Sequence, residues 1–329
     1  MQVKEIAALL KEKNARHIAI LCHHNADPDA ACSAYAFSQL LKRFKPDVNI
    51  EISAAQGPSK LCRQILLAVP IVLVDQPHIE EADILVLLDT NTVQQLDEWK
   101  PRVIKAAKPL IVVDHHATHP RTKDIAALCI ADESSSSTCE IVYNLYKEAS
   151  FELTKKEAIA LFLGIAYDTK HFILASSKTF KVVADLIDIG VVAEEALSLL
   201  HMQMDVSERI ARLKAAKRMN LMKLGEWLIC FSNVSAYQAS AARALLSVGV
   251  DMGIVGGEKE GKLRISMRSS TRFNQETGIH LGRDIAKPLG EQVGGMGGGH
   301  ATSAGVNGEG DFKEAAKKCV RLLREKLKG

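Results

Sequence analysis

The chain has 329 residues, of which 47% are hydrophobic and 25% charged, the balance of a soluble globular protein with room for two domains. Its 42 basic and 39 acidic residues leave a formal net charge of +3, too near neutrality for a whole-molecule field that attracts long nucleic acids. No apolar run reaches the roughly 18–20 residues of a membrane span, so we expect no membrane-spanning segment.

The seven cysteines predict reduced thiols. Their number is odd and no two have C-x-x-C spacing, which argues against a disulfide framework and against a thiolate zinc site. The first 16 residues have the pattern of a charged amphipathic helix and lack the long apolar core of a signal peptide. We therefore expect a cytoplasmic protein.

The first half of the chain alternates short apolar runs with helical patterns, such as the one over Ala30–Phe44. Runs of this length, rich in Ile, Val and Leu, are typical of strands that are covered on both faces. With helices between them, they predict a parallel sheet of βαβ units. The runs are His17–Cys22, Val48–Ser53, Ile71–Val74, Ile84–Leu88 and Leu110–Val113.

Three helices follow the predicted sheet, over residues 138–149, 154–165 and 177–190. The serine run 134–137 supplies an N-cap for the first, and Thr154 with Glu157 forms a capping box for the second. We assign residues 1–192 to one domain and residues 193–224, which are charged and helical in pattern, to a helical linker. Residues 225–329 then form a smaller α/β domain, and we expect the active site in a cleft between the two domains.

Acidic and histidine residues gather directly after four predicted elements of the first domain. The carboxyl ends of parallel strands converge on one edge of a sheet, where ligands bind, so three of the four clusters should lie within reach of one another. A single Asp after a strand is often only a helix cap or a turn residue, but four such clusters are hard to attribute to capping. The clusters are His23 with Asp27 and Asp29, then Asp89, then Asp114-His115-His116, then Asp168.

The residue types of these clusters indicate a divalent metal site. Carboxylates mixed with imidazole suit Mn²⁺, Mg²⁺, Fe²⁺ or Zn²⁺. Six candidate ligands are too many for one ion with open positions, but they suit two ions about 3.5–4 Å apart that share a bridging carboxylate. Pairs of metal ions at this spacing are common in enzymes that catalyse in-line displacement at phosphorus.

In these residues the sequence resembles the DHH phosphoesterase superfamily, and the resemblance spans nearly the whole chain. Asp114-His115-His116 is similar to the triplet that names the family, and His23, Asp27 and Asp29 match its first motif. In the second domain, Gly297-Gly298-Gly299-His300 is similar to the GGGH signature of the DHH-associated domain, and Arg268-Ser269 matches a second substrate-binding feature of that domain. The motifs occur in order and with compatible spacing.

The resemblance implies a role for each residue. His23, Asp27 and Asp89 would hold one metal ion, and Asp29, Asp89, His115 and Asp168 the other, with Asp89 as the bridge. His116 would contact the substrate phosphate, and Asp114 would orient a histidine ring. Arg268, Ser269, Gly297, Gly298, Gly299 and His300 would bind substrate. Mn²⁺ is the usual activating ion of the family, with Mg²⁺ or another divalent ion as the alternative.

The small two-domain form resembles the oligoribonuclease and phosphoadenosine-phosphate phosphatase branch, which implies hydrolysis of short oligonucleotides to mononucleotide 5′-phosphates. Aromatic residues make up 5% of the chain, so few stacking platforms exist for a long single strand. The departures from the family pattern, Asn25-Ala26 and Lys170-His171, spare the metal ligands and leave the shape of the substrate pocket open.

Four alternatives remain open. They are a phosphodiesterase for cyclic di-AMP or linear dinucleotides, a RecJ-like single-strand exonuclease, an inorganic pyrophosphatase, and a nucleotide-binding protein with a degenerate site. The GGGH signature and Arg268-Ser269 argue against a pyrophosphatase, and the complete ligand set argues against a degenerate site. The sequence leaves open RNA against DNA, chain polarity and oligomeric state, with a homodimer among the options.

Overall fold

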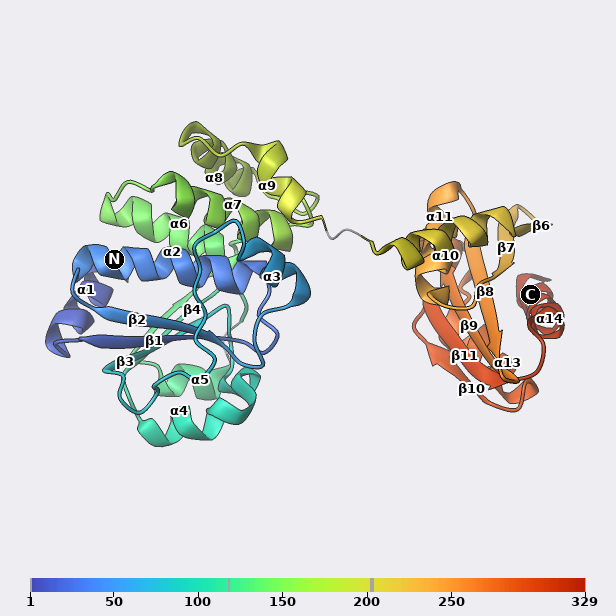
Figure 1. The fold of residues 1–329 in the computed structure, drawn as a ribbon, viewed down its shortest axis with the longest axis horizontal. Helices are drawn as coiled ribbons and strands as arrows, with labels where there is room; N and C mark the ends of the chain where they lie inside the picture. Colours follow the sequence, from blue (N-terminus) through green and yellow to red (C-terminus); the bar gives the residue numbers. More distant parts are fainter. Residues whose placement is uncertain (1, 118, 202–203, 329) are drawn as a thin grey trace. The chain divides into compact units, whose positions relative to one another are not determined.

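The computed structural model describes residues 2–117, 119–201 and 204–328 and divides the chain into two compact units, Met1–Met202 and Gln203–Gly329 (Figure 1). The division falls inside the segment 193–224. Helix α9 (Ala193–Leu199) belongs to the first unit and helix α10 (Val206–Lys217) to the second. The end of that segment is not helical as expected, because Asn220–Leu224 forms strand β6 and pairs with the following strand.

The first unit contains a five-stranded sheet in which all neighbouring strands are parallel, in the order β2-β1-β3-β4-β5. This confirms the predicted α/β architecture. Alternate residues of β1 pack on opposite faces: Ile18 and Ile20 join one hydrophobic core, and Ala19 and Leu21 join another. The strands are β1 (His17–Cys22), β2 (Asn49–Ala54), β3 (Ile84–Leu88), β4 (Leu110–Asp114) and β5 (Leu128–Ala131).

One expected strand is wrong and one observed strand was not expected. Ile71–Val74 is not a strand, because only Leu73 forms a bridge to Ile52 of the edge strand β2, and Val72 is 79% exposed. Strand β5 was not predicted, since its run of four residues is only partly buried at the other edge of the sheet.

Helices cover both faces of this sheet, as Figure 1 shows. Helices α2, α6, α7 and α8 form the layer on one face, with α1, α3 and α9 beside them, and η1, α4 and α5 lie on the other. Their bounds are α1 (Gln2–Glu12), α2 (Pro28–Phe44), α3 (Lys60–Ile65), η1 (Val93–Trp99), α4 (Lys100–Ala106), α5 (Pro120–Ile125), α6 (Thr138–Ala149), α7 (Lys155–Asp168) and α8 (Ser177–Asp188).

The second unit contains a six-stranded mixed sheet in the order β10-β11-β9-β8-β7-β6. Helices α10 and α11 (Gln238–Val248) pack on one face, while α12 (Thr271–Thr277), η2 (Leu281–Ala286), α13 (Lys287–Gln292) and α14 (Phe312–Lys328) pack on the other. The remaining strands are β7 (Trp227–Asn233), β8 (Met252–Lys259), β9 (Lys262–Ser269), β10 (Met296–Gly299) and β11 (Ser303–Glu309). Among the described residues, no helix combines the length and apolar character that crossing a bilayer requires.

Candidate metal centre

Eight residues predicted at the site of the first unit lie together at the carboxyl edge of its sheet. They form three overlapping groups, in each of which one possible ligand atom per residue lies within 4.8 Å of the others. The overlap is such that Asp89 and His115 each belong to two groups. The groups are His23, Asp27 and Asp89; Asp29, His115 and Asp168; and Asp89, Asp114, His115 and His116.

Asp89 lies at the centre of this arrangement, directly after β3, and only 5% of its surface is exposed. Its Oδ2 lies 3.7 Å from Nε2 of His23, and its Oδ1 lies 3.6 Å from Nε2 of His115. Each carboxylate oxygen therefore faces a different group of candidate ligands. The Asp89 backbone has a φ of +51°, an uncommon conformation for a residue other than glycine and one that often marks functional sites.

His23 is held with one ring nitrogen pointing toward the carboxylates. Its Nδ1 donates to the backbone carbonyl of His24 at 2.9 Å, so Nε2 faces Asp89 and, at 4.0 Å, Oδ1 of Asp27. A backbone acceptor on one ring nitrogen is the usual way to orient a metal-ligating histidine. Without a metal, burial works to lower the pKa of His23, but the interactions with Asp89, the His24 carbonyl and Asp27 raise it to about 9.

The two aspartates that follow β1 are fixed by helix termini. Asp27 is the N-cap of α2, and its Oδ1 accepts from the backbone N–H groups of Asp29 and Ala30 at 3.0 and 3.1 Å. Asp29 has no exposed surface and accepts from the backbone N–H groups of Thr138 and Cys139 at the start of α6. Burial and the nearby Asp89 raise the pKa of Asp27 to about 6.

His115 carries a buried nitrogen that has acidic neighbours but no hydrogen-bond partner. Its Nε2 lies 3.1 Å from Oδ2 of Asp168, at the end of α7, but the two atoms lack hydrogen-bond geometry, so Nε2 has no hydrogen-bond partner. Because a buried polar atom without a partner is costly, this nitrogen fits a ligand position. Burial works to lower the pKa of His115, and Asp168, Asp89 and Asp114 raise it overall.

The charges of the cluster also fit a cation. Burial, reinforced by the charges of Asp168, Asp89 and Asp27, raises the pKa of Asp29 well above its ordinary value, and burial together with Asp89 raises the pKa of Asp114. So many buried carboxylates repel one another unless positive charge is present. Their oxygens and the imidazole nitrogens form a donor set that suits a hard or borderline divalent ion.

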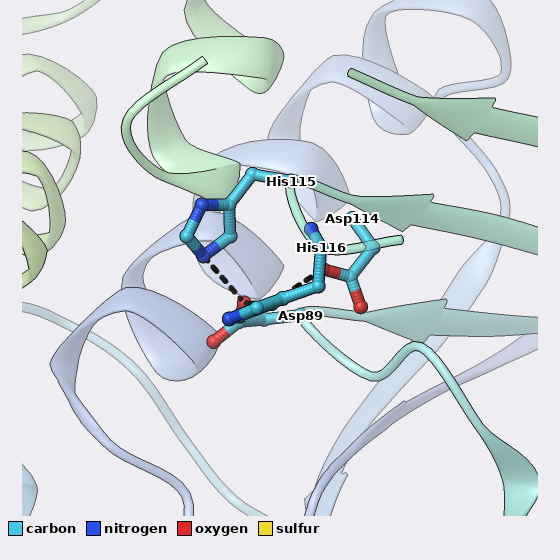
Figure 2. Close-up of side chains that lie close together, drawn as sticks. All are labelled: Asp89, Asp114, His115 and His116. Atoms are coloured by element: carbon cyan, nitrogen blue, oxygen red, sulfur yellow. Dashed lines mark hydrogen bonds and ion pairs between the residues drawn. The ribbon is translucent and has the colours of Figure 1, made fainter. Parts of the chain in front are cut away.

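Asp114 and His116 form a hydrogen-bonded pair within the group that also contains Asp89 and His115 (Figure 2). Asp114, at the end of β4, is fully buried, and its Oδ1 accepts from the backbone N–H of His116 at 2.7 Å and from ring Nδ1 at 2.9 Å. The side chain of His116 is 56% exposed, so Nε2 remains free for a ligand. Asp114 therefore orients the His116 ring.

The residues predicted to bind substrate gather at one end of the sheet in the second unit. Arg268 and Ser269 end β9, and Arg268 pairs in register with Ser303 of β11. His300 follows β10 and donates its backbone N–H to the carbonyl of Ser303 at 2.7 Å. Burial, with the nearby Arg243, lowers the pKa of Arg268. The hydroxyl of Ser269 is buried and has no hydrogen-bond partner.

The glycine run forms edge strand β10, and two of its positions show why glycine is needed. A Cβ at Gly297 would lie 1.8 Å from the carbonyl oxygen of Ala286, so glycine lets η2 lie directly on the strand. A Cβ at Gly298 would meet nothing within 4 Å. One face of β10 is therefore packed against the helix, and Gly298 faces open space.

The sequence did not reveal the contacts of Thr138. Its hydroxyl donates to Oδ1 of Asp89 at 3.0 Å, and its backbone N–H donates to Oδ2 of Asp29 at 2.7 Å. Thr138 was predicted only as the first residue of a helix. The available signal was its position after β5, since a hydroxyl at the N-terminus of a helix that starts from the same sheet edge can reach the ligands there.

The α/β fold and this cluster together define a class of protein with a centre of carboxylates and imidazoles at the sheet edge, a donor set that suits divalent metal. The family model described as DHH family, N-terminal domain, matches residues 17–165, and the model of the DHHA1 domain matches residues 235–329. An uncharacterized protein of Methanocaldococcus jannaschii is 35% identical over 323 residues, which cover 95% of this chain and 93% of that protein. The chain belongs to the DHH family, as its motifs predicted.

Relatives with named activities are more distant. The bifunctional oligoribonuclease and PAP phosphatase NrnA of Bacillus subtilis is 27% identical over 229 residues, 68% of this chain and 64% of that protein. The cyclic-di-AMP phosphodiesterase PdeA of Listeria monocytogenes is 27% identical over 264 residues, 77% of this chain but only 37% of that protein. An exopolyphosphatase-related protein from Bacteroides fragilis shares the fold, with a TM-score of 0.62 and 20% identity over 99% of this chain and 98% of its own.

Proposed function

We propose that this protein is a manganese-dependent phosphodiesterase that hydrolyses short oligonucleotides to mononucleotide 5′-phosphates and also accepts phosphoadenosine phosphate. The observation that carries the proposal is Asp89, whose two carboxylate oxygens face separate groups of ligands. A carboxylate with this placement suits a bridge between two ions. A cytoplasmic setting is part of the proposal, and it agrees with the burial of six of the seven cysteines.

The proposed ligand sets build on two of the observed groups. His23, Asp27 and Asp89 would hold one ion. Asp29, His115 and Asp168 would hold the other together with Asp89, whose Oδ1 lies 3.6 Å from Nε2 of His115. When bound, a pair of divalent ions supplies an activated water for in-line attack on phosphorus and neutralises charge on the phosphoryl oxygens. The chain's own part is to fix the ligand atoms before substrate arrives, and the hydrogen bonds to His23, Asp27 and Asp29 do this.

His116 contacts the phosphoryl group in this proposal. Asp114 holds its Nδ1, which leaves the exposed Nε2 to interact with a phosphoryl oxygen as negative charge develops there. In the second unit, the Arg268 guanidinium and the His300 ring bind phosphate oxygens, while Gly298 lets the substrate approach the backbone of β10. Ser269 adds a hydroxyl that has no hydrogen-bond partner among the described residues.

The substrate class rests on chemistry and on relatives. Few aromatic residues are present for stacking a long strand, since aromatics are 5% of the chain and Phe273 lies entirely in the core. NrnA of Bacillus subtilis, which is named for oligoribonuclease and PAP phosphatase activities, aligns with 68% of the chain. We therefore place the preferred substrate at a few nucleotides.

The test is a Mn²⁺-dependent hydrolysis assay over a panel of RNA and DNA oligomers of about two to five nucleotides, phosphoadenosine phosphate, cyclic di-AMP, a long single strand and pyrophosphate. The expected result is release of mononucleotides fastest from the shortest oligomers, and loss of that release in the Asp89→Asn variant. Cleavage of pyrophosphate alone, or equal rates on long and short strands, would overturn the substrate assignment. No hydrolysis of any compound, despite bound Mn²⁺, would point instead to a nucleotide-binding protein.

A second candidate activity is hydrolysis of cyclic di-AMP. It is favoured by the similarity to PdeA of Listeria monocytogenes over 77% of the chain, although the matched part is 37% of that protein. The same panel separates the two, because a cyclic dinucleotide has no free end and must be opened before a mononucleotide is released. Faster turnover of cyclic di-AMP than of the linear dinucleotide would make this the principal activity.

A further inference from the structure

Thr138 lies where two of the buried carboxylates meet. It is the first residue of α6, has no exposed surface, and follows the N-cap Ser137, whose hydroxyl accepts from the backbone N–H of Glu140. It is 49 residues from Asp89 and 109 from Asp29 in the chain, yet it contacts both. These contacts are made by two different donors of the same residue.

The hydroxyl of Thr138 contacts one particular oxygen of Asp89. It donates to Oδ1, the oxygen that faces His115, at 3.0 Å. The other oxygen, Oδ2, faces His23. A hydrogen bond to one oxygen only restricts rotation of the carboxylate about its terminal bond, so that the two oxygens keep their separate directions.

The backbone N–H of Thr138 holds the second carboxylate. It donates to Oδ2 of Asp29 at 2.7 Å, and the next N–H, from Cys139, donates to Oδ1 at 3.0 Å. The Thr138 residue thus sets the distance between a carboxylate on α2 and the central carboxylate after β3. Of these two carboxylates, Asp29 belongs to the ligand group of His115 and Asp168, and Asp89 is the proposed bridge.

The loop before Thr138 is anchored from a third direction. The Glu140 carboxylate accepts from the hydroxyl of Ser136 at 2.5 Å and from that of Thr179 on α8 at 3.2 Å. Asp132 accepts from the hydroxyls of Ser134 and Ser135 at 2.7 and 2.8 Å. The loop before Thr138 is therefore held by hydrogen bonds that do not involve Asp29 or Asp89.

We infer that Thr138 is a positioning residue for the metal centre: its hydroxyl fixes Asp89 as the bridge, so that the ion on the His115 side binds tightly. The inference rests on the proposed two-metal function. Thr138 makes no contact with substrate in this role, and it acts on catalysis only through the carboxylates. Removing a hydrogen-bonding partner behind a metal ligand typically weakens metal binding by about 10–100-fold.

The test is Mn²⁺ titration of the full-length, metal-stripped protein, followed by electron paramagnetic resonance. The wild type should take up two ions and show the signal of a coupled pair. Thr138→Val, which keeps the shape but loses the hydroxyl, should bind one ion roughly 10–100-fold more weakly and lose the coupled signal at matched Mn²⁺. Excess Mn²⁺ should restore its kcat, and Thr138→Ser should behave like the wild type.

Ser137→Ala is the matched control, because it removes the helix cap next to Thr138 without touching either carboxylate. It should lower the melting temperature and leave Mn²⁺ affinity unchanged. Unchanged affinity in Thr138→Val, equal weakening in Ser137→Ala, or no rescue by Thr138→Ser would each overturn the inference while leaving the metal centre intact. A wild type that binds no Mn²⁺ would overturn both. If Thr138→Val does not fold, Thr138→Ala carries the same test.

Discussion

Removing Mn²⁺ from the full-length protein will lower the melting temperature of the first unit and leave that of the second unchanged. All the ligand groups found among the described residues lie in Met1–Met202, and the buried carboxylates of Asp29, Asp89 and Asp114 lie close to one another with only histidine rings to offset their charge. Bound cations therefore stabilise the folded state of this unit alone, because the unfolded chain does not hold the ligands together.

The magnitude follows from the number of ions and the size of the unit. One ion at a free concentration of 100 times its Kd stabilises by about 2.7 kcal/mol, so two ions contribute about 5.4 kcal/mol. In a unit of about 200 residues, 1 kcal/mol moves the melting temperature by roughly 2–4 °C. The expected shift is therefore roughly 11–22 °C.

Differential scanning calorimetry of the chain with Mn²⁺ and with a chelator measures this shift. Asp89→Asn should lose most of it, because Asp89 belongs to both ligand sets. Asp97→Asn is the control, since Asp97 lies 3.6 Å from His24 but outside the three ligand groups. An unchanged melting temperature, an equal shift of the second unit, or an equal loss in Asp97→Asn would refute the reasoning.

Three further predictions concern catalysis, substrate and pH. Asp114→Asn should lower kcat by about 10–100-fold and leave Mn²⁺ affinity within about twofold, because among the described residues the Asp114 carboxylate accepts hydrogen bonds only from His116, which is not a proposed metal ligand. A parallel loss of affinity in calorimetric titration would contradict this role. Gly297→Ala should destabilise the second unit by about 1–3 kcal/mol in thermal unfolding, since the added Cβ meets the Ala286 carbonyl. Gly298→Ala should leave stability unchanged and raise KM for a short oligonucleotide, because its Cβ meets no protein atom within 4 Å. Similar unfolding of both variants would argue against the packed face of β10. Mn²⁺ affinity should rise as pH increases from about 6 to about 9, because the ion must displace protons from Asp27 and His23, whose pKa values in the metal-free protein are about 6 and about 9. The rise is at most about tenfold per pH unit for each proton released, and calorimetric titrations in two buffers of different ionisation enthalpy would measure that release. An affinity independent of pH would count against these two groups as ligands.

Local pattern was sufficient for four of the five strands of the first unit's sheet and for most of its helices. Ile84–Leu88 and His17–Cys22 were predicted with the bounds that the structure has, because short runs of Ile, Val and Leu are buried on both faces. The capping box at Thr154 is present as predicted. Pattern failed for β10, since glycines have no side chains to reveal a strand, and pairing with β11 determines its conformation.

The sequence by itself determined that the clusters after β1, β3 and β4 meet at the sheet edge, because parallel strands bring their carboxyl ends together whatever the details of packing. Asp168, at the end of α7, reaches His115 through the packing of that helix. Only the tertiary structure decided how Asp89 divides its two oxygens between His23 and His115, and that Thr138 holds it. The reason is distance along the chain. Asp29 and Thr138 are 109 residues apart, and their contact depends on how α2 and α6 pack, which no local spacing specifies.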